Sequence, residues 1–157
     1  MKILLPVDGS ELSLEAVRYA TRLVREGLQA DFVVANVQEP ATLYEVIRAH
    51  DPQVLDEVRG DAGVHLLQAA QELLSQADVE YETEVSSGDP AHTLIDIVER
   101  FGCEAIIMGA RGRGPLTAAL MGSVSQDVLR HSPVPVTIVR PPAAAELEED
   151  EGEDAAA

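Results

Sequence analysis

Short apolar segments alternate with helix-patterned segments along most of this chain, and that alternation leaves few folds open. Continuous apolar runs at Ile3–Val7, Phe32–Val37 and Ala105–Met108 are typical of central strands covered on both faces. Val79–Val85 instead alternates apolar and acidic residues, and Pro135 lies within Val134–Val139, so these two segments are expected at sheet edges. The pattern predicts an α/β fold: a doubly wound, five-stranded parallel sheet of order 3-2-1-4-5 with helices on both faces.

Capping residues set the expected helix boundaries. Ser10 is a predicted N-cap and Gly27 the stop of the first helix, and Asp89 with Pro90 opens another. The expected helices cover residues 12–26, 43–49, a segment ending near 77, 90–101 and 123–131. The connection from Gln38 to Glu57 is long, and connections of this length are uncommon unless they cover a site or an interface.

Length and charge narrow the classes of partner. The 157 residues fit one domain, expected over 1–141, with 142–157 as a disordered acidic tail. The net charge of -17 repels phosphodiester backbones, which argues against a nucleic-acid partner. Cys103 is the only cysteine, so no intrachain disulfide and no thiolate metal cluster are expected. No signal-peptide pattern and no membrane-spanning apolar run is found, so we expect a cytoplasmic protein without a membrane partner.

Two unusual loops follow the first and fourth strands, which flank the point where the strand order reverses and where such sheets bind ligands. The first is Pro6–Ser10, and the second runs from Gly109 to Ser125. Gly109 and Gly112 allow close backbone approach, and the helix that begins at Ser123 offers free N–H groups to an anion. A hydroxyl on Ser123 or Ser125 can donate to a phosphate oxygen, although Ser123 and Gln126 also match a capping box.

The glycine spacing separates this loop from other phosphate-binding motifs. It is not a P-loop, and Thr117 stands where the dinucleotide fingerprint needs a third glycine. Gly109, Gly112 and Gly122-Ser123 follow the spacing G-x2-G-x9-G-[ST], which resembles the motif of ATP-binding universal stress proteins. The resemblance covers Met1–Arg140 and includes Gly88-x-Pro90 and Pro133–Val136.

The resemblance implies roles for individual positions. Pro6, Val7 and Asp8 would line the nucleoside side, Val37 would contact adenine, and Met108 and Gly109 would border the ribose and phosphates. Gly112, Gly122, Ser123, Val124 and Ser125 would hold the phosphate chain of ATP, with AMP or ADP as alternatives, and Mg²⁺ would ride on the phosphates. Arg111 remains open between a phosphate contact and a solvent-facing side chain. The resemblance also implies a homodimer through the last strand, Val134–Val139.

These features predict a nucleotide-dependent switch in a stress response, read by an unidentified protein partner, rather than an efficient enzyme. The loop lacks lysine and a clear general base, so no catalytic residue is assigned and at most slow ATP hydrolysis is expected. A nucleotide-free dimeric scaffold remains the alternative. An adenine-nucleotide α-hydrolase enzyme would need an SGGxDS-like loop after the first strand, and a flavodoxin-like protein would need aromatic residues to stack on flavin.

Overall fold

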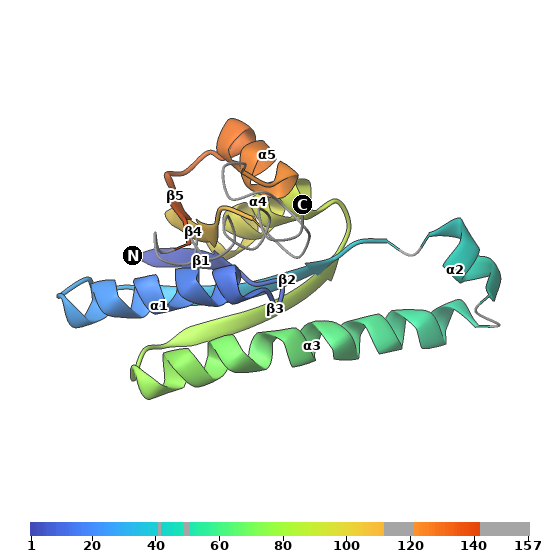
Figure 1. Cartoon of the computed structure of the whole chain (residues 1–157), viewed down its shortest axis with the longest axis horizontal. Coiled ribbons are helices and arrows are strands. Elements are labelled where there is room, and N and C mark those ends of the chain that lie inside the picture. The colour runs from blue at the N-terminus through green and yellow to red at the C-terminus, as the bar shows by residue number, and fades with distance from the viewer. Residues whose placement is uncertain (41, 49–50, 112–120, 142–157) are drawn as a thin grey trace, which may run out of the picture.

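The computed structural model describes residues 1–40, 42–48, 51–111 and 121–141, and within them the chain forms one parallel sheet of order β3-β2-β1-β4-β5. The predicted fold class and strand order are confirmed, with β3 and β5 at the edges (Figure 1). The strands are β1 (Lys2–Pro6), β2 (Asp31–Gln38), β3 (Tyr81–Ser87), β4 (Ala105–Gly109) and β5 (Val136–Val139). The helices are α1 (Glu11–Arg25), α2 (Leu43–Arg48), α3 (Pro52–Gln76), α4 (Pro90–Phe101) and α5 (Ser123–His131).

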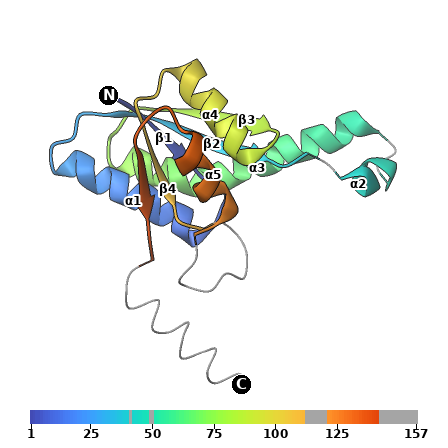
Figure 2. The ribbon, with the colours of Figure 1, turned by 90° about the horizontal axis from the view of Figure 1, so that it is seen from above.

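Two apolar layers enclose the sheet. On one face, α1 and α3 pack on alternate strand residues such as Leu5 and Phe32. On the other face, α4 and α5 pack on the intervening residues, such as Leu4 and Val33 (Figures 1 and 2). The continuous apolar strands therefore bury both of their faces, as the sequence indicated.

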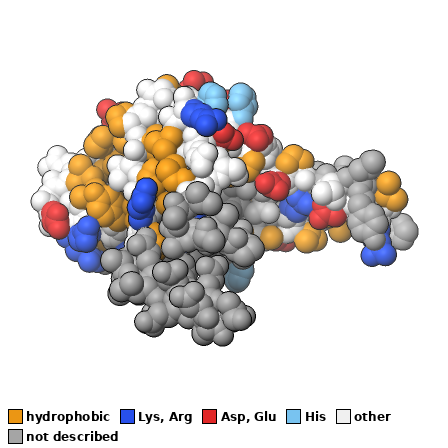
Figure 3. All heavy atoms as spheres, turned by 45° about the horizontal axis from the view of Figure 1, so that its top comes forward, with side chains coloured by type: hydrophobic (Ala, Val, Ile, Leu, Met, Phe, Trp, Pro, Cys, Tyr) orange, Lys and Arg blue, Asp and Glu red, His pale blue; other side chains and the backbone are white. Residues whose placement is uncertain are grey.

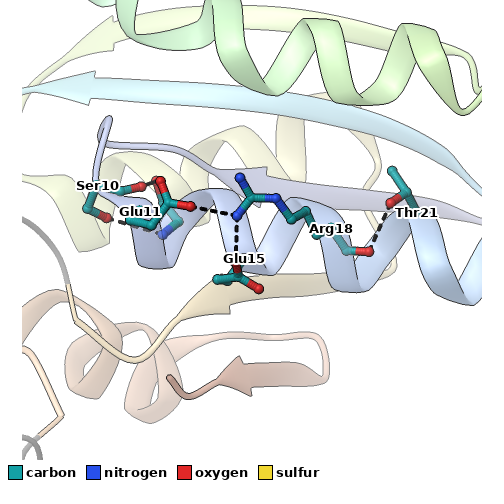
Figure 4. Close-up of polar contacts among 6 residues, drawn as sticks. Ser10, Glu11, Glu15, Arg18 and Thr21 are labelled. Atoms are coloured by element: carbon teal, nitrogen blue, oxygen red, sulfur yellow. Dashed lines mark hydrogen bonds and ion pairs between the residues drawn. The ribbon is translucent and has the colours of Figure 1, made fainter. Parts of the chain in front are cut away.

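The first helix shows how local sequence sets an element. The Ser10 hydroxyl accepts a hydrogen bond from the Ser13 N–H at 3.1 Å, which confirms Ser10 as the N-cap. Along the solvent side of α1, Arg18 pairs with both Glu11 and Glu15 (Figure 4). The helix gives way to Gly27 with φ 112°, a backbone conformation that favours glycine.

Three boundaries differ from the expectations by two residues or more; one is β5, which begins at Val136 and not at Val134, so Pro135 precedes the strand. Helix α3 begins at Pro52, capped by Asp51, because proline at the first helical position is favoured, so the connection after β2 is shorter than expected. Strand β3 runs two residues later than expected, because Asp78 (φ 55°) turns the chain after α3 and pairing with β2 starts near Tyr81. Among the described residues, no helix is both long and apolar enough to cross a membrane. The segment 142–157, interpreted as an acidic tail, lies outside the described residues.

Cys103 is buried between α4 and the sheet, and its burial raises the pKa of the thiol above the ordinary value of 9.0. We therefore expect slow alkylation of Cys103 in the native protein at pH 8 and fast alkylation in denaturant, measured by mass spectrometry with iodoacetamide. As the pH rises, the thiol loses its proton at a lower pH in the unfolded chain than in the native protein. The free energy of unfolding is therefore unaffected by this group below about pH 9 and falls as the pH rises further. Equal alkylation rates in the native and unfolded states would contradict this prediction.

Candidate functional site

The turn between β1 and α1 is held by its own side chains. Beyond β1, the Val7 N–H donates to the Ala35 carbonyl at 2.8 Å, which extends the contact with β2. The Asp8 carboxylate accepts from the Ser10 N–H at 2.9 Å, and Gly9 takes φ 81°. This turn therefore places the N-terminus of α1 beside the carboxyl end of β1.

The junction between β4 and α5 is closed by one carbonyl. The Ala110 carbonyl accepts from the Gly122 N–H at 2.8 Å and from the Ser125 hydroxyl at 2.7 Å. Ala110 in turn donates its N–H to the Val139 carbonyl of β5 at 2.8 Å. The chain on either side of residues 111–121 is thus brought together, and α5 starts beside the end of β4.

Close packing at Gly109 joins these two loops. A Cβ atom at position 109 would lie 3.1 Å from the Leu12 carbonyl oxygen and 3.2 Å from its carbon, both of which belong to the first turn of α1. Since β1 and β4 are neighbouring parallel strands, their carboxyl ends meet at one edge. The first predicted loop and the described ends of the second therefore meet there, where the strand order reverses.

The start of α5 offers backbone donors. Gly122 is the N-cap, and the first bond of the helix runs from the Gln126 N–H to the Gly122 carbonyl at 3.1 Å. The preceding N–H groups, of Ser123, Val124 and Ser125, have no partner within a helix. With the positive end of the helix dipole, they form an arrangement suited to an anion.

The two serine hydroxyls of this helix lie differently. The Ser125 hydroxyl is buried and donates to the Ala110 and Gly122 carbonyls, so it holds the junction together, whereas Ser123 is exposed. The capping box expected from Ser123 and Gln126 does not form. Ser123 is the first helical residue instead of the cap, and the Gln126 side chain donates to the Met121 carbonyl at 3.1 Å.

Three of the apolar candidates lie on the same face of the sheet at this end. Val37, Met108 and Val124 belong to the cluster that α4 and α5 form with the sheet, whereas Val7 faces α1 and α3. Pro6 lies half-buried at the end of β1. The arrangement provides a partly apolar wall beside the N–H donors of α5, which suits a ligand with an apolar ring and an anionic end.

Charged candidates border the edge. Asp8 lies in the β1–α1 turn, and Arg111, half-buried, lies two residues past the end of β4. Gly112 lies outside the described residues. Sequence reasoning missed Arg140, which the pairing of Gly109 with Val139 places opposite Ala110 on the neighbouring strand. In the sequence, Arg140 could have been noticed as a single basic residue directly after the last strand.

Sequence reasoning also missed Asn36, a buried amide next to the β1–α1 turn. Its Nδ2 donates to the Val7 carbonyl at 2.8 Å, and its Oδ1 accepts from the Gln38 amide. Gly63 of α3 packs closely here, because a Cβ atom at that position would lie 3.0 Å from Asn36 Oδ1 and 2.6 Å from Val85 Cγ1. Asn36 thus fixes the backbone that precedes Asp8; the signal was a polar residue inside an apolar strand.

Replacing Asn36 with leucine should lower the free energy of unfolding by about 2 kcal/mol, because the Val7 carbonyl loses its buried donor. The matched change Gln38→Leu removes only the outer hydrogen bond and should cost about 1 kcal/mol or less. Urea unfolding of both variants measures the difference. An equal fall in the free energy of unfolding of the two variants would show that the hydrogen bond from Asn36 to the Val7 carbonyl does not stabilise the protein more than the outer bond does.

Two surface hollows are found elsewhere in the described structure. One, of about 390 Å³, lies along α3 at Gln68 and Gln71, and the other, of about 650 Å³, lies between β3 and α4 at Ser86 and Thr93. Both are shallow. We assign the candidate site to the carboxyl ends of β1 and β4, which we call the β1–β4 edge. There the strand ends, the N-terminus of α5 and the close packing at Gly109 coincide.

Comparison with known sequences gives one consistent result. The model of the universal stress protein family matches residues 1–140. The protein YxiE of Bacillus subtilis is 31% identical over 147 residues, covering 88% of this chain and 98% of YxiE. The protein MJ0531 of Methanocaldococcus jannaschii is 27% identical over 141 residues, covering 90% of this chain and 82% of MJ0531.

Solved structures show the same fold. The structure of protein MJ0577 has a TM-score of 0.74 at 23% identity and covers 90% of this chain and 96% of its own. A universal stress protein in complex with cAMP has a TM-score of 0.64 at 22% identity, and the match covers 89% of this chain and 96% of that protein's chain. A universal stress protein family protein of Arabidopsis thaliana with AMP bound has a TM-score of 0.66 at 18% identity, and the match covers 92% of this chain and 94% of that protein's chain.

Proposed function

The chain belongs to the universal stress protein family, and from that premise we propose that its β1–β4 edge binds an adenine nucleotide, with ATP as the expected ligand. The observation that carries the proposal is the junction at Ala110, whose carbonyl fixes Gly122 and Ser125 and so holds the N–H groups of α5 at the edge. The AMP and cAMP complexes of two structural neighbours support the choice of an adenine nucleotide.

The proposed ligand lies with its phosphates at the start of α5. There, the N–H groups of Ser123, Val124 and Ser125 donate to phosphate oxygens, and Arg111 and Arg140 add positive charge. The base contacts the apolar wall that includes Val37 and Met108, and Asp8 borders the sugar. These N–H donors suit phosphate and not a metal ion, so Mg²⁺ would be held by the phosphates.

We propose a binding switch and not an efficient ATPase. The only lysine, Lys2, begins β1 and pairs with Glu82 at 2.7 Å. The candidate site lies past the other end of this strand, about 13 Å further at the usual rise per residue. Fast phosphoryl transfer needs a positioned nucleophile and a group that stabilises the transition-state charge, and the described edge supplies only binding groups.

We also propose a homodimer through β5. The Pro135 and Val139 carbonyls accept from the N–H groups of Ile106 in β4 and of Ala110, which follows β4, so the backbone groups of the alternate residues, Val136 and Ile138, face away from the sheet. Such an open edge can pair with a second strand. Sedimentation equilibrium should then give twice the mass of one chain.

The test of nucleotide binding is to denature freshly purified protein and to identify the released compound by chromatography, followed by titration of the emptied protein with ATP, ADP and AMP. Adenine nucleotide released by the protein, or bound on titration, would support the proposal. Protein that is empty and stays empty would leave the nucleotide-free dimeric scaffold as the better account. Rapid multiple-turnover hydrolysis would contradict the switch and indicate an enzyme.

A further inference from the structure

A helical arm extends from the sheet and is unrelated to the proposed nucleotide site. We define the arm as α2 together with residues 52–62 of α3 (Figures 1 and 2). The residues of α3 that are buried against the sheet begin at Gly63 and continue with Leu67, Ala70 and Leu74. Residues 52–62 therefore extend about 16 Å beyond the packed part of the helix.

The arm is built by specific contacts. The Glu45 carboxylate accepts from the N–H and hydroxyl of Thr42 at 2.7 and 2.9 Å, which holds the first turn of α2 and keeps the pKa of Glu45 below its ordinary value. Arg59 of α3 pairs with Glu45 at 2.9 Å and also donates to the Glu39 carbonyl. These contacts fasten α2 to α3 and both to the end of β2.

Despite these contacts, the arm leaves large apolar side chains in solvent. Ile47, Val54 and Val58 are 71%, 54% and 59% exposed, and we call these three residues the arm face; Val64, just past the arm on α3, is 55% exposed. Of the six large hydrophobic residues that are exposed in the described part of the chain, three form the arm face and Val64 is a fourth close to it. Scattered exposed apolar residues need no explanation, but a concentration on one projecting element indicates a contact surface.

Acidic residues border the arm face. Glu57 and Asp61 are exposed and lie three residues after Val54 and Val58, so they share the same side of α3. Figure 3 shows hydrophobic, acidic and a few basic side chains interspersed along the arm. Arg59 directs its guanidinium at the Glu45 carboxylate and the Glu39 backbone carbonyl. Arg48, at the end of α2, is an exposed cation on the arm, so the basic residues of a partner are expected against Glu57 and Asp61 and not beside Ile47.

We propose that the arm face docks a protein segment that forms a basic amphipathic helix, with apolar residues against the valines and Lys or Arg residues against Glu57 and Asp61. An amphipathic helix laid along an apolar helix face is a recurring mode of recognition. The charge selects this occupant over a second copy of the chain: pairing two arm faces would bring like carboxylates together, and each copy carries a net charge of -17.

The experiment uses the full chain and a fluorescent peptide of about 18 residues made of leucine and lysine, with the leucines at helical spacing. A scrambled peptide of the same composition has the same charge without the apolar stripe. Fluorescence anisotropy should show that the amphipathic peptide binds at least about tenfold more tightly than the scrambled one. Equal affinity of the two peptides, or no binding at about 100 μM, would overturn the proposal.

Two sets of variants locate the contact. Val54→Ser with Val58→Ser should weaken binding of the amphipathic peptide at least about tenfold, because the lost contacts are apolar. The matched control Leu129→Ser changes an apolar residue that is 43% exposed on α5 and should leave the affinity unchanged. Glu57→Gln with Asp61→Asn should weaken binding and reduce its dependence on salt.

Sedimentation of the same variants tests the competing occupant. If Val54→Ser with Val58→Ser converts an oligomer into a monomer, a second copy covers the arm face and the proposal is wrong. An unchanged mass together with weakened peptide binding supports it. Thermal unfolding should be unchanged, because the two valines are exposed; a fall would show that they hold the arm together, which would also overturn the proposal.

Discussion

Valine in place of Gly122 should weaken adenine-nucleotide binding by about 100-fold, which corresponds to about 2.7 kcal/mol. Gly122 caps α5 with φ -66° and ψ 159°, a conformation open to any residue, so the backbone is not strained by the change. The new branched side chain would stand at the helix start, where the proposed phosphates approach the N–H groups of Ser123 and Val124. Isothermal titration with ATP measures the loss.

Gly60→Val is the matched control for Gly122→Val. It also replaces a glycine in the described structure with valine, and a Cβ atom there would have nothing within 4 Å. Nucleotide affinity should be unchanged, and stability should stay equal or rise slightly because valine favours a helix more than glycine does. If Gly122→Val binds ATP as well as the wild-type protein does, the phosphates do not lie at the start of α5.

Valine in place of Gly109 should lower the free energy of unfolding by about 3 kcal/mol, since overpacking a tight contact is costly. The added Cβ would lie 3.1 Å from the Leu12 carbonyl oxygen, and a backbone atom cannot move aside as the end of a side chain can. The first turn of α1 must shift, which also displaces the Gly9–Ser10 turn. Nucleotide affinity should therefore fall at least about tenfold along with stability.

Gly109→Ala gives the graded comparison for this position. Its single methyl group should lower the free energy of unfolding by about 1 kcal/mol, so urea unfolding should show Gly109→Ala to be more stable than Gly109→Val. Gly60→Val again serves as the neutral control. Full stability in Gly109→Val would mean that the contact between β4 and α1 is looser than the 3.1 Å separation indicates.

Local features of the sequence predicted most of the fold. The Ser10 cap, the Asp89-Pro90 helix start and the run Ile3–Val7 act within a few residues, so their outcomes did not depend on distant parts of the chain. The edge position of β3 followed from its acidic alternation; the edge position of β5 was predicted from Pro135, which the structure places just before that strand. The capping box at Ser123 failed, because a matching four-residue pattern does not say which residue becomes the cap.

Contacts between distant segments decided the rest. The sequence by itself determined which strands are central and which lie at the edges, from which the strand order was predicted, together with the two loops and the glycine spacing, because strand periodicity and turn chemistry are encoded locally. Only the tertiary structure paired Asn36 with the Val7 carbonyl, placed Arg140 opposite Ala110 and pressed Gly109 against Leu12. The arm face likewise emerged only in three dimensions, because exposure of Val54 and Val58 depends on where the sheet ends and not on the helical pattern of the residues themselves.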